Sequence, residues 1–222
     1  MKEDLLEQVV DDYLQTQGYF TTHNVRFNPA KTHPEYVSNK DSVSSDVDVV
    51  GCHPTKTGPD RVLAVSCKSW QTGFDATRIL AQLRGEAPNP KRARELSFRE
   101  VWIPKWAEAF RLRLEQLTGQ KAFTYCIAVT HLKGDTAAWS DDATIRSNLA
   151  GNPMRFLPLE LMWSAVLAEV TKTPASSEIG RLAQLLKAAG LTDQHALGAP
   201  TPPAPGTDAA LADLVEQGEL ET

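Results

Sequence analysis

Two short valine-rich stretches, residues 45–51 and 62–70, constrain the fold of this chain more than any other feature. Each is bounded by glycine or proline, and this composition predicts a β-strand. A hairpin through residues 53–60 would make the two strands neighbours in one sheet. We therefore expect a sheet that contains both stretches, and its surface is the first place to look for a functional site.

Polar side chains occupy alternate positions of both strands. Because side chains alternate between the two faces of a strand, Asp46 and Asp48 share one face, and so do Ser66 and Lys68. Carboxylate oxygens suit a hard cation, and a lysine beside the cation can orient a water for attack on phosphate or help deprotonate it. The plainer alternative is a surface ion pair of little energetic value. The apolar residues at the other positions favour buried strands, and thus the site.

The composition is typical of one domain of moderate size with an appendage. The chain has 222 residues, 41% of them hydrophobic, and a formal net charge of −5, which argues against a general coat for nucleic acid. No apolar run reaches the roughly eighteen residues that span a membrane, and the first residues predict a charged helix rather than a secretory signal. Cys52, Cys67 and Cys126 lack zinc-site spacing and are expected as free thiols. We therefore expect a cytoplasmic protein that does not enter the membrane.

A local excess of positive charge lies between Arg78 and Lys121. This segment holds ten Lys and Arg against five Glu. The excess could face the phosphates of a nucleic acid, and an ordinary solvated helix surface is the alternative. Every fourth position of the same segment carries a large apolar side chain, at Trp102, Trp106, Phe110 and Leu114. That spacing favours a buried helix face over a platform for stacking bases.

The order of elements predicts an α/β fold with a mixed central sheet flanked by helices. Beside the two valine-rich strands, the pattern predicts strands over 19–27, 122–132 and 154–157 and helices over 3–17, 77–85, 91–117 (interrupted at Pro104), 141–149, 160–170 and 178–189. Loops are expected over 28–44 and 134–140. We expect a main domain over 1–170, a helical extension over 171–197, a proline-rich linker over 198–207 and an acidic C-terminal helix over 208–222.

Three of these elements, taken in order, resemble the PD-(D/E)xK nuclease superfamily, in particular its Mrr-like branch of type IV restriction endonucleases. The first helix carries Glu7 and ends at Gly18-Tyr19, the next strand carries Asp48 in the run Asp-Val-Val-Gly, and the third carries Cys67-Lys68. The resemblance covers roughly residues 3–170. It implies a restriction-endonuclease-like fold for the main domain.

The resemblance also implies a chemistry: hydrolysis of DNA by an endonuclease that depends on Mg²⁺ or Mn²⁺, in restriction, defence or DNA processing. It implies that Asp48 and the main-chain carbonyl of Cys67 bind the metal. Glu7 and Asp46 are the candidates to complete the ligands, directly or through water. Lys68 would orient the attacking water and stabilise the developing charge.

Ser66 departs from the family pattern, which has an acid at this position, although Mrr-like members can carry glutamine there. A serine hydroxyl is a weaker ligand and brings no charge to offset a divalent cation. Two functions therefore stay open. Either Asp46 or Glu7 supplies the missing oxygen and the chain cuts DNA, or the chain is a catalytically inactive nuclease-fold subunit for DNA binding or assembly. In both cases DNA is an expected partner, and a second copy or another protein is expected at the C-terminal tail.

Overall fold

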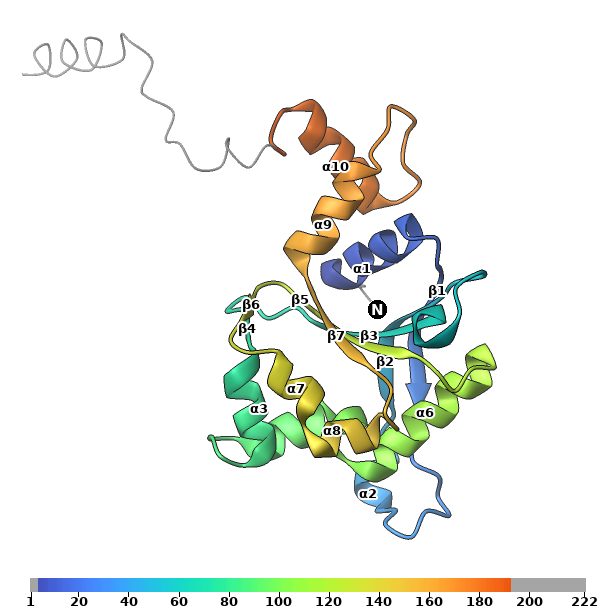
Figure 1. Ribbon diagram of the computed structural model, residues 1–222, viewed down its shortest axis with the longest axis vertical. Helices are drawn as coiled ribbons and strands as arrows, with labels where there is room; N and C mark the ends of the chain where they lie inside the picture. Colours follow the sequence, from blue (N-terminus) through green and yellow to red (C-terminus); the bar gives the residue numbers. More distant parts are fainter. Residues whose placement is uncertain (1–3, 193–222) are drawn as a thin grey trace, which may run out of the picture. The chain divides into compact units, whose positions relative to one another are not determined.

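The computed structural model of the chain describes residues 4–192 (Figure 1). The chain divides into two units between Gln184 and Leu185. The first unit contains the sheets and the helices up to the middle of α10 (Glu178–Ala188), and residues 185–188 of the second hold the end of that helix. The linker predicted over 198–207 and the acidic helix predicted over 208–222 lie outside the described residues.

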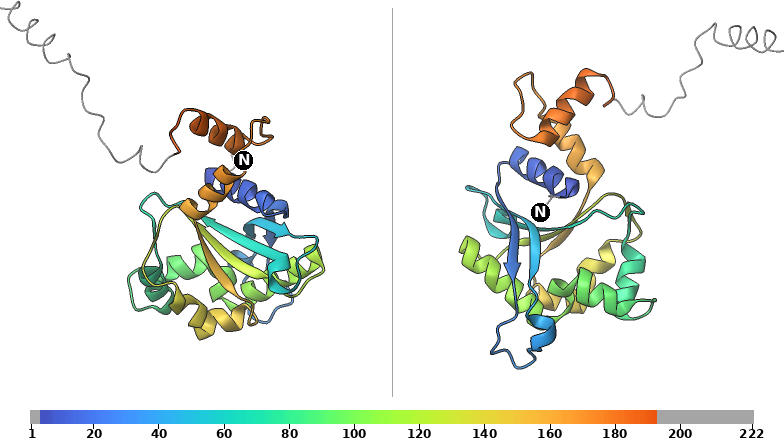
Figure 2. Two further views of the ribbon diagram at one scale, coloured as in Figure 1. Left: turned by 45° about the horizontal axis from the view of Figure 1, so that its top comes forward. Right: turned by 180° about the vertical axis from the view of Figure 1, so that it is seen from behind.

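A mixed five-stranded sheet forms the centre of the first unit, in the order β1-β2-β3-β5-β7 (Figures 1 and 2). Its strands are β1 (Phe20–Phe27), β2 (Ser45–Cys52), β3 (Val62–Lys68), β5 (Thr124–Val129) and β7 (Met154–Pro158). Neighbours among β1, β2 and β3 are antiparallel, whereas β3, β5 and β7 run parallel. The predicted hairpin of the two valine-rich strands is confirmed, with Val49 opposite Val65. A separate pair of short strands joins β4 (Phe74–Asp75) to β6 (Leu132–Lys133).

Helices cover both faces of this sheet (Figure 2). One face packs against α1 (Leu5–Thr16), α9 (Leu159–Ala168) and the start of α10. The other packs against α3 (Ala76–Arg84), α5 (Arg99–Trp102), α6 (Pro104–Thr118), α7 (Ala137–Asp141) and α8 (Ala143–Asn148). Shorter helical segments are α2 (Ser38–Asp41), η1 (Gly58–Arg61), α4 (Pro90–Arg92) and the π-helix η2 (Ala93–Ser97). The α/β architecture with a mixed central sheet flanked by helices is thus confirmed.

The ends of α1 are fixed by local contacts that also place it over the sheet. Asp4 caps the helix by accepting a hydrogen bond from Leu6 N at 2.9 Å, and Gly18 adopts a φ of 83° just after the helix ends. The Asp4 carboxylate also accepts a hydrogen bond from the hydroxyl of Ser69, immediately after β3. The first turn of α1 is therefore held at the carboxyl end of β3.

Three segments differ from the sequence predictions. The loop expected over 28–44 contains α2, and the loop expected over 134–140 contains α7, whose Trp139 is fully buried and donates to Ala76 O at 2.9 Å. The segment 91–117 divides into α4, η2, α5 and α6. Ile103 has an extended backbone because a residue that precedes proline is disfavoured in a helix. Apart from α6, these helices have three to five residues and are too short for an apolar period to be recognised.

The predicted apolar face of α6 is buried as expected. Trp106, Phe110 and Leu114 are exposed by 3%, 0% and 1%, and Trp102, on α5, packs half-buried against the same core. The ring of Phe110 meets the rings of Phe27, Phe123 and Tyr125 in tilted or edge-to-face contacts. The residues of this face support the sheet rather than meet a ligand.

Phe110→Ala is therefore expected to lower the free energy of unfolding by about 3–5 kcal/mol, since it removes a buried ring and leaves a cavity. The matched control is Leu112→Ala on the same helix, where the side chain is 52% exposed. We expect that control to change the free energy by no more than about 0.5 kcal/mol. Urea unfolding followed by tryptophan fluorescence measures both variants. Equal losses in the two would contradict the packing of α6 described here.

Candidate functional site

Asp48 lies where the antiparallel pairing of β2 is interrupted on both sides. Toward β3 the ladder ends at the pair Val49–Val65. Toward β1 the pairing skips Asn24, whose φ of 51° is left-handed and takes its backbone out of the ladder. The Asp48 carboxylate fills the gap by accepting a hydrogen bond from Cys67 N at 2.5 Å. The sheet thus opens locally around one carboxylate.

Lys68 ends β3 on the face of the sheet opposite α1. Its Nζ donates to Ser66 Oγ at 2.7 Å and lies 5.2 Å from the centre of the Phe98 ring. Ser66 itself is 4% exposed. The ammonium is therefore held between a buried hydroxyl and an aromatic ring, an arrangement that restricts its side-chain freedom.

A buried carboxylate that the sequence did not single out, Glu100 of α5, lies behind Ser66. Tyr125 of β5 donates to Glu100 Oε1 at 2.5 Å, and its hydroxyl also hydrogen-bonds with Ser66. Glu100 is 5% exposed and Tyr125 is fully buried. Hydrogen bonds thus connect the Lys68 ammonium, through two hydroxyls, to a carboxylate. The negative charge that Ser66 lacks comes from a different element of the fold.

The electrostatic surroundings of Asp48 are unfavourable to its charge. Burial raises the pKa of Asp48 above its ordinary value, and the charges of Asp46 and Glu100 raise it further. The charge of Lys68 and the hydrogen bond from Cys67 N oppose that rise without cancelling it. Asp48 is therefore a carboxylate that additional positive charge would stabilise.

Glu7 approaches the same strand from the α1 side. Burial, followed by the charges of Asp48 and Glu7, raises the pKa of the Cys67 thiol well above its usual range. The Cys67 side chain packs against the apolar cluster beneath α1, away from Lys68, as strand alternation predicts. A thiol in these surroundings stays protonated and is not a nucleophile.

Within residues 4–192, neither Asp46 nor Gln82 forms a hydrogen bond or an ion pair with Lys68. Asp46 is exposed on β2, opposite Arg26 of β1, and its negative charge raises the pKa of Asp48. Gln82, on the helix α3 that follows the lysine strand, donates to Pro88 O at 2.8 Å. The structure therefore brings Asp48, Ser66 and Lys68 together with Glu100 as an additional member.

The oxygen atoms around Asp48 provide some of the ligands that Mg²⁺ needs, but not a complete preformed site. Within residues 4–192, no three His, Cys, Asp or Glu side chains lie close enough together to hold a metal ion. Mg²⁺ is commonly bound through one or two carboxylates and completed by water and substrate phosphates. Asp48 with the main-chain carbonyl of Cys67 is a donor set of that kind, and the raised pKa of Asp48 is the imbalance that a cation would relieve.

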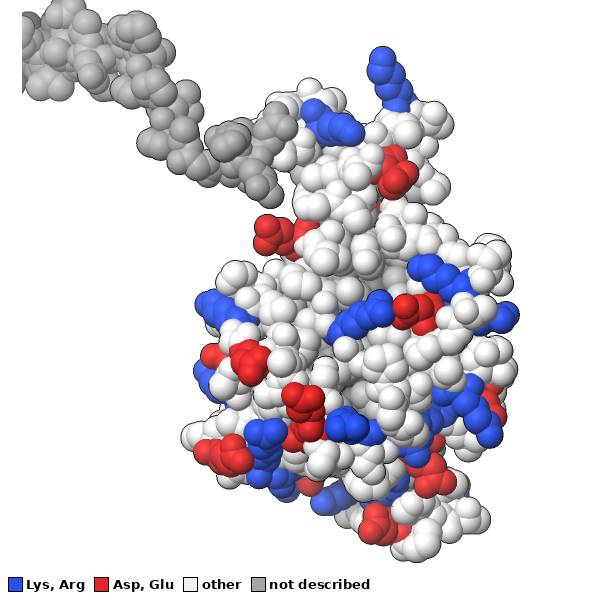
Figure 3. All heavy atoms as spheres, viewed as in Figure 1, with Lys and Arg blue, Asp and Glu red and all other residues white. Residues whose placement is uncertain are grey.

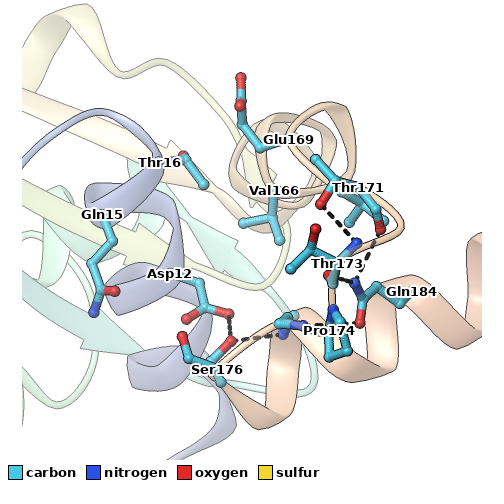
Figure 4. Close-up of a pocket in the computed structure, with 14 residues that line it drawn as sticks. Asp12, Gln15, Thr16, Val166, Glu169, Thr171, Thr173, Pro174, Ser176 and Gln184 are labelled. Atoms are coloured by element: carbon cyan, nitrogen blue, oxygen red, sulfur yellow. Dashed lines mark hydrogen bonds between the residues drawn. The ribbon is translucent and has the colours of Figure 1, made fainter.

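A second buried acid, Asp12, has a structural role near the other end of α1. It lines a cavity of about 280 Å³ between α1, α9 and the loop before α10 (Figure 4). Its carboxylate accepts a hydrogen bond from Ser177 Oγ at 2.6 Å, and Ser177 Oγ in turn accepts one from Gly180 N at 2.9 Å. Burial raises the pKa of Asp12 as well. These contacts fix the start of α10 against α1.

Comparisons with known proteins do not assign the chain to a family. No protein-family model, no curated protein and no solved structure matches the chain significantly. In the part of the chain from residue 4 to residue 192, no helix has both the length and the apolar character needed to cross a membrane. The function has to be inferred from the geometry around Asp48 and Lys68.

Asp48→Asn is expected to raise the free energy of unfolding at pH 7.5 by about 0.5–2 kcal/mol. The folded pKa of Asp48 lies above the ordinary value of 3.8, so the folded chain binds more protons than the unfolded chain between those two pKa values. Stability therefore falls as the pH rises through that window, and the loss is complete above the folded pKa. Asparagine removes the charge and keeps an acceptor for Cys67 N.

Thermal unfolding at pH 4 and pH 7.5 measures this effect. The difference between Asp48→Asn and the parent chain should be larger at pH 7.5 than at pH 4. The control, Asp46→Asn, changes an exposed carboxylate on the same strand and is expected to have a much smaller effect. A melting temperature lowered by Asp48→Asn at pH 7.5 would contradict the electrostatic description of the site.

Proposed function

We propose that the chain is a metal-dependent DNA endonuclease with a restriction-endonuclease-like fold, related to the Mrr-like branch of the PD-(D/E)xK superfamily. The observation that carries this proposal is the meeting of Asp48 and Lys68 at the opening of the sheet, on adjacent strands and each held by a hydrogen bond. The mixed sheet and the position of α1 at the end of β3 support it.

In phosphodiester hydrolysis, the residues of the site would have two roles, metal binding and orientation of the attacking water. A bound Mg²⁺ or Mn²⁺ would lower the pKa of a water and offset the charge of the phosphate. Asp48 and the Cys67 main-chain carbonyl would hold the ion, with Glu7 and Asp46 contributing through water. Lys68 orients the attacking water and stabilises the negative charge that develops on the phosphate.

Glu100 acts as a positioning residue in this proposal. It holds Tyr125, which hydrogen-bonds with Ser66, the residue that accepts from Lys68 Nζ. Because each of these groups is hydrogen-bonded and largely buried, the network fixes the direction of the ammonium at little further entropic cost. Ser66 can then replace the family's acid without leaving Lys68 unsupported.

Cleavage of supercoiled plasmid under Mg²⁺ and under Mn²⁺ tests the assignment. Lys68→Ala and Asp48→Asn are each expected to lower the cleavage rate by about 10²–10⁴-fold, because they remove charge stabilisation and the metal ligand. Lys121→Ala is the control, since that side chain is 83% exposed and lies after the end of α6. Cleavage that survives both site substitutions at the parent rate would refute the proposal.

Glu100→Gln tests the positioning role separately. Glutamine keeps an acceptor for Tyr125 and removes the charge, so we expect kcat to fall by about tenfold while KM stays unchanged. Near-ultraviolet circular dichroism shows whether the variant keeps its tertiary packing. An unchanged kcat in a folded Glu100→Gln variant would remove Glu100 from the mechanism.

Ser66 also favours a second candidate, a catalytically silent module that binds DNA. In that case the position beside Lys68 holds the hydroxyl of Ser66 rather than an acid, because a module that does not cut DNA needs no metal ligand there. Calorimetric titration with Mg²⁺ and Mn²⁺ separates the two functions. Retained DNA binding with no heat of metal binding at millimolar concentration, and no cleavage, would favour the silent module.

A further inference from the structure

Most of the basic residues between Arg78 and Lys121 are already engaged by other groups. The engaged side chains and their partners are Arg84 with Asp142, Arg94 with Leu83 O, Arg99 with the Trp106 ring, Lys105 with Asp41, Arg111 with Asn148 O, and Lys121 with Glu115. Figure 3 shows side chains of both signs interspersed over the visible face. A broad basic surface is therefore not what this segment provides.

Four cations of the segment keep their side chains available. Within residues 4–192, Arg78, Lys91, Arg92 and Arg113 form no ion pair, and their side chains donate no hydrogen bond to a described residue. Arg78 and Arg92 come together, because both line one pocket of about 310 Å³ between α3, α4 and η2. Two of the four available cations thus lie at one pocket.

This pocket has an apolar floor and a polar rim. Its floor consists of the buried side chains of Ile79, Ala93 and Phe98. The rim adds Gln82, Asn89 and Ser97 to the two arginines, and Trp70 completes the wall. Five of the nine lining residues are polar or charged, so the pocket suits a charged ligand with an apolar part, and its volume is near the lower end for small-ligand sites.

The Phe98 ring connects this pocket to Lys68, which is not itself one of the lining residues. Phe98 lines the pocket, and the centre of that ring is 5.2 Å from Lys68 Nζ. Trp70 follows Lys68 by two residues, and its ring meets Phe98 edge-to-face with the ring centres 6.5 Å apart. A ligand in the pocket would therefore lie beside the group to which we assign the attack on phosphate.

The backbone that forms the pocket is unusual and well fixed. Its wall is the π-helix η2, and such helices occur frequently at functional sites. Asn89, at the rim, has a left-handed φ of 65°. Arg94 donates to Leu83 O and Gln82 donates to Pro88 O, so side chains tie η2 to α3 and α3 to the loop before α4. These contacts hold together the segments that line the pocket.

We propose that this pocket binds one unpaired nucleotide of the DNA beside the phosphate that is cleaved. The inference rests on the proposed function. Arg78 and Arg92 take the phosphate, because guanidinium groups match its charge and geometry. The base lies against Trp70, the half-buried aromatic side chain of the lining, where stacking is favourable for any base. A base that is paired and stacked within the duplex cannot lie in such a pocket, so the nucleotide has to leave the duplex to enter.

Binding of 2′-deoxyadenosine 5′-monophosphate to the full chain in EDTA tests the pocket without cleavage. Calorimetry should show binding at least tenfold tighter than that of inorganic phosphate or of deoxyadenosine. The double substitution Arg78→Gln and Arg92→Gln should weaken nucleotide binding at least tenfold. Arg113→Gln, an exposed and unpaired arginine of α6, is the matched control and should bind as the parent chain does.

The outcomes separate this inference from the proposed function. Inorganic phosphate binding as tightly as the nucleotide would overturn it, as would equal losses in the double variant and the Arg113→Gln control. Asp48→Asn should bind the nucleotide normally, because that carboxylate is not part of the pocket. DNA cleavage without nucleotide binding would support the proposed nuclease function and refute the nucleotide pocket. Nucleotide binding without DNA cleavage would support the pocket and refute the nuclease function.

Discussion

A carboxylate and an ammonium can lie within a largely buried sheet only where each has a hydrogen-bonding partner that is not already used in the pairing of the strands. Asp48 meets this condition because the β2–β3 ladder stops at Val49–Val65, so that Cys67 N donates to its side chain instead. Lys68 meets it through Ser66. The opening of the sheet is therefore the constraint from which the arrangement of the site follows, and α1, α5 and β5 supply groups that surround it.

The parts of this arrangement that follow from a local period could be predicted from the sequence. Alternation along a strand places Ser66 and Lys68 on one face and Cys67 on the other, and the valine content predicts the hairpin that brings Asp48 beside them. The same reasoning works for the apolar face of α6, since the spacing of its residues equals the helical period. These predictions depend on neighbours within one element or one hairpin.

Glu100 could not be predicted in this way because its place depends on tertiary packing. It is 34 residues from Ser66 in the chain, and only the packing of α5 against β5 brings it to Tyr125. The one available signal was that Glu100 directly precedes the apolar residues Val101, Trp102 and Ile103. The basic segment shows the same limit, because a count of charges does not reveal which arginines already have partners. The helices of about one turn (α2, α4, α5 and α7) and the π-helix η2 are likewise too short to leave a periodic pattern in the sequence.

The left-handed backbone of Asn24 has a consequence for the surface of the sheet as well as for its interior. β1 is an edge strand, and an unbroken edge is a template on which the strand of another molecule can add by main-chain hydrogen bonds. The kink at Asn24 divides that edge into two short runs, neither of which offers a long register for pairing. One irregular residue thus interrupts the β1–β2 pairing beside Asp48 and also shortens the register that β1 offers to another strand.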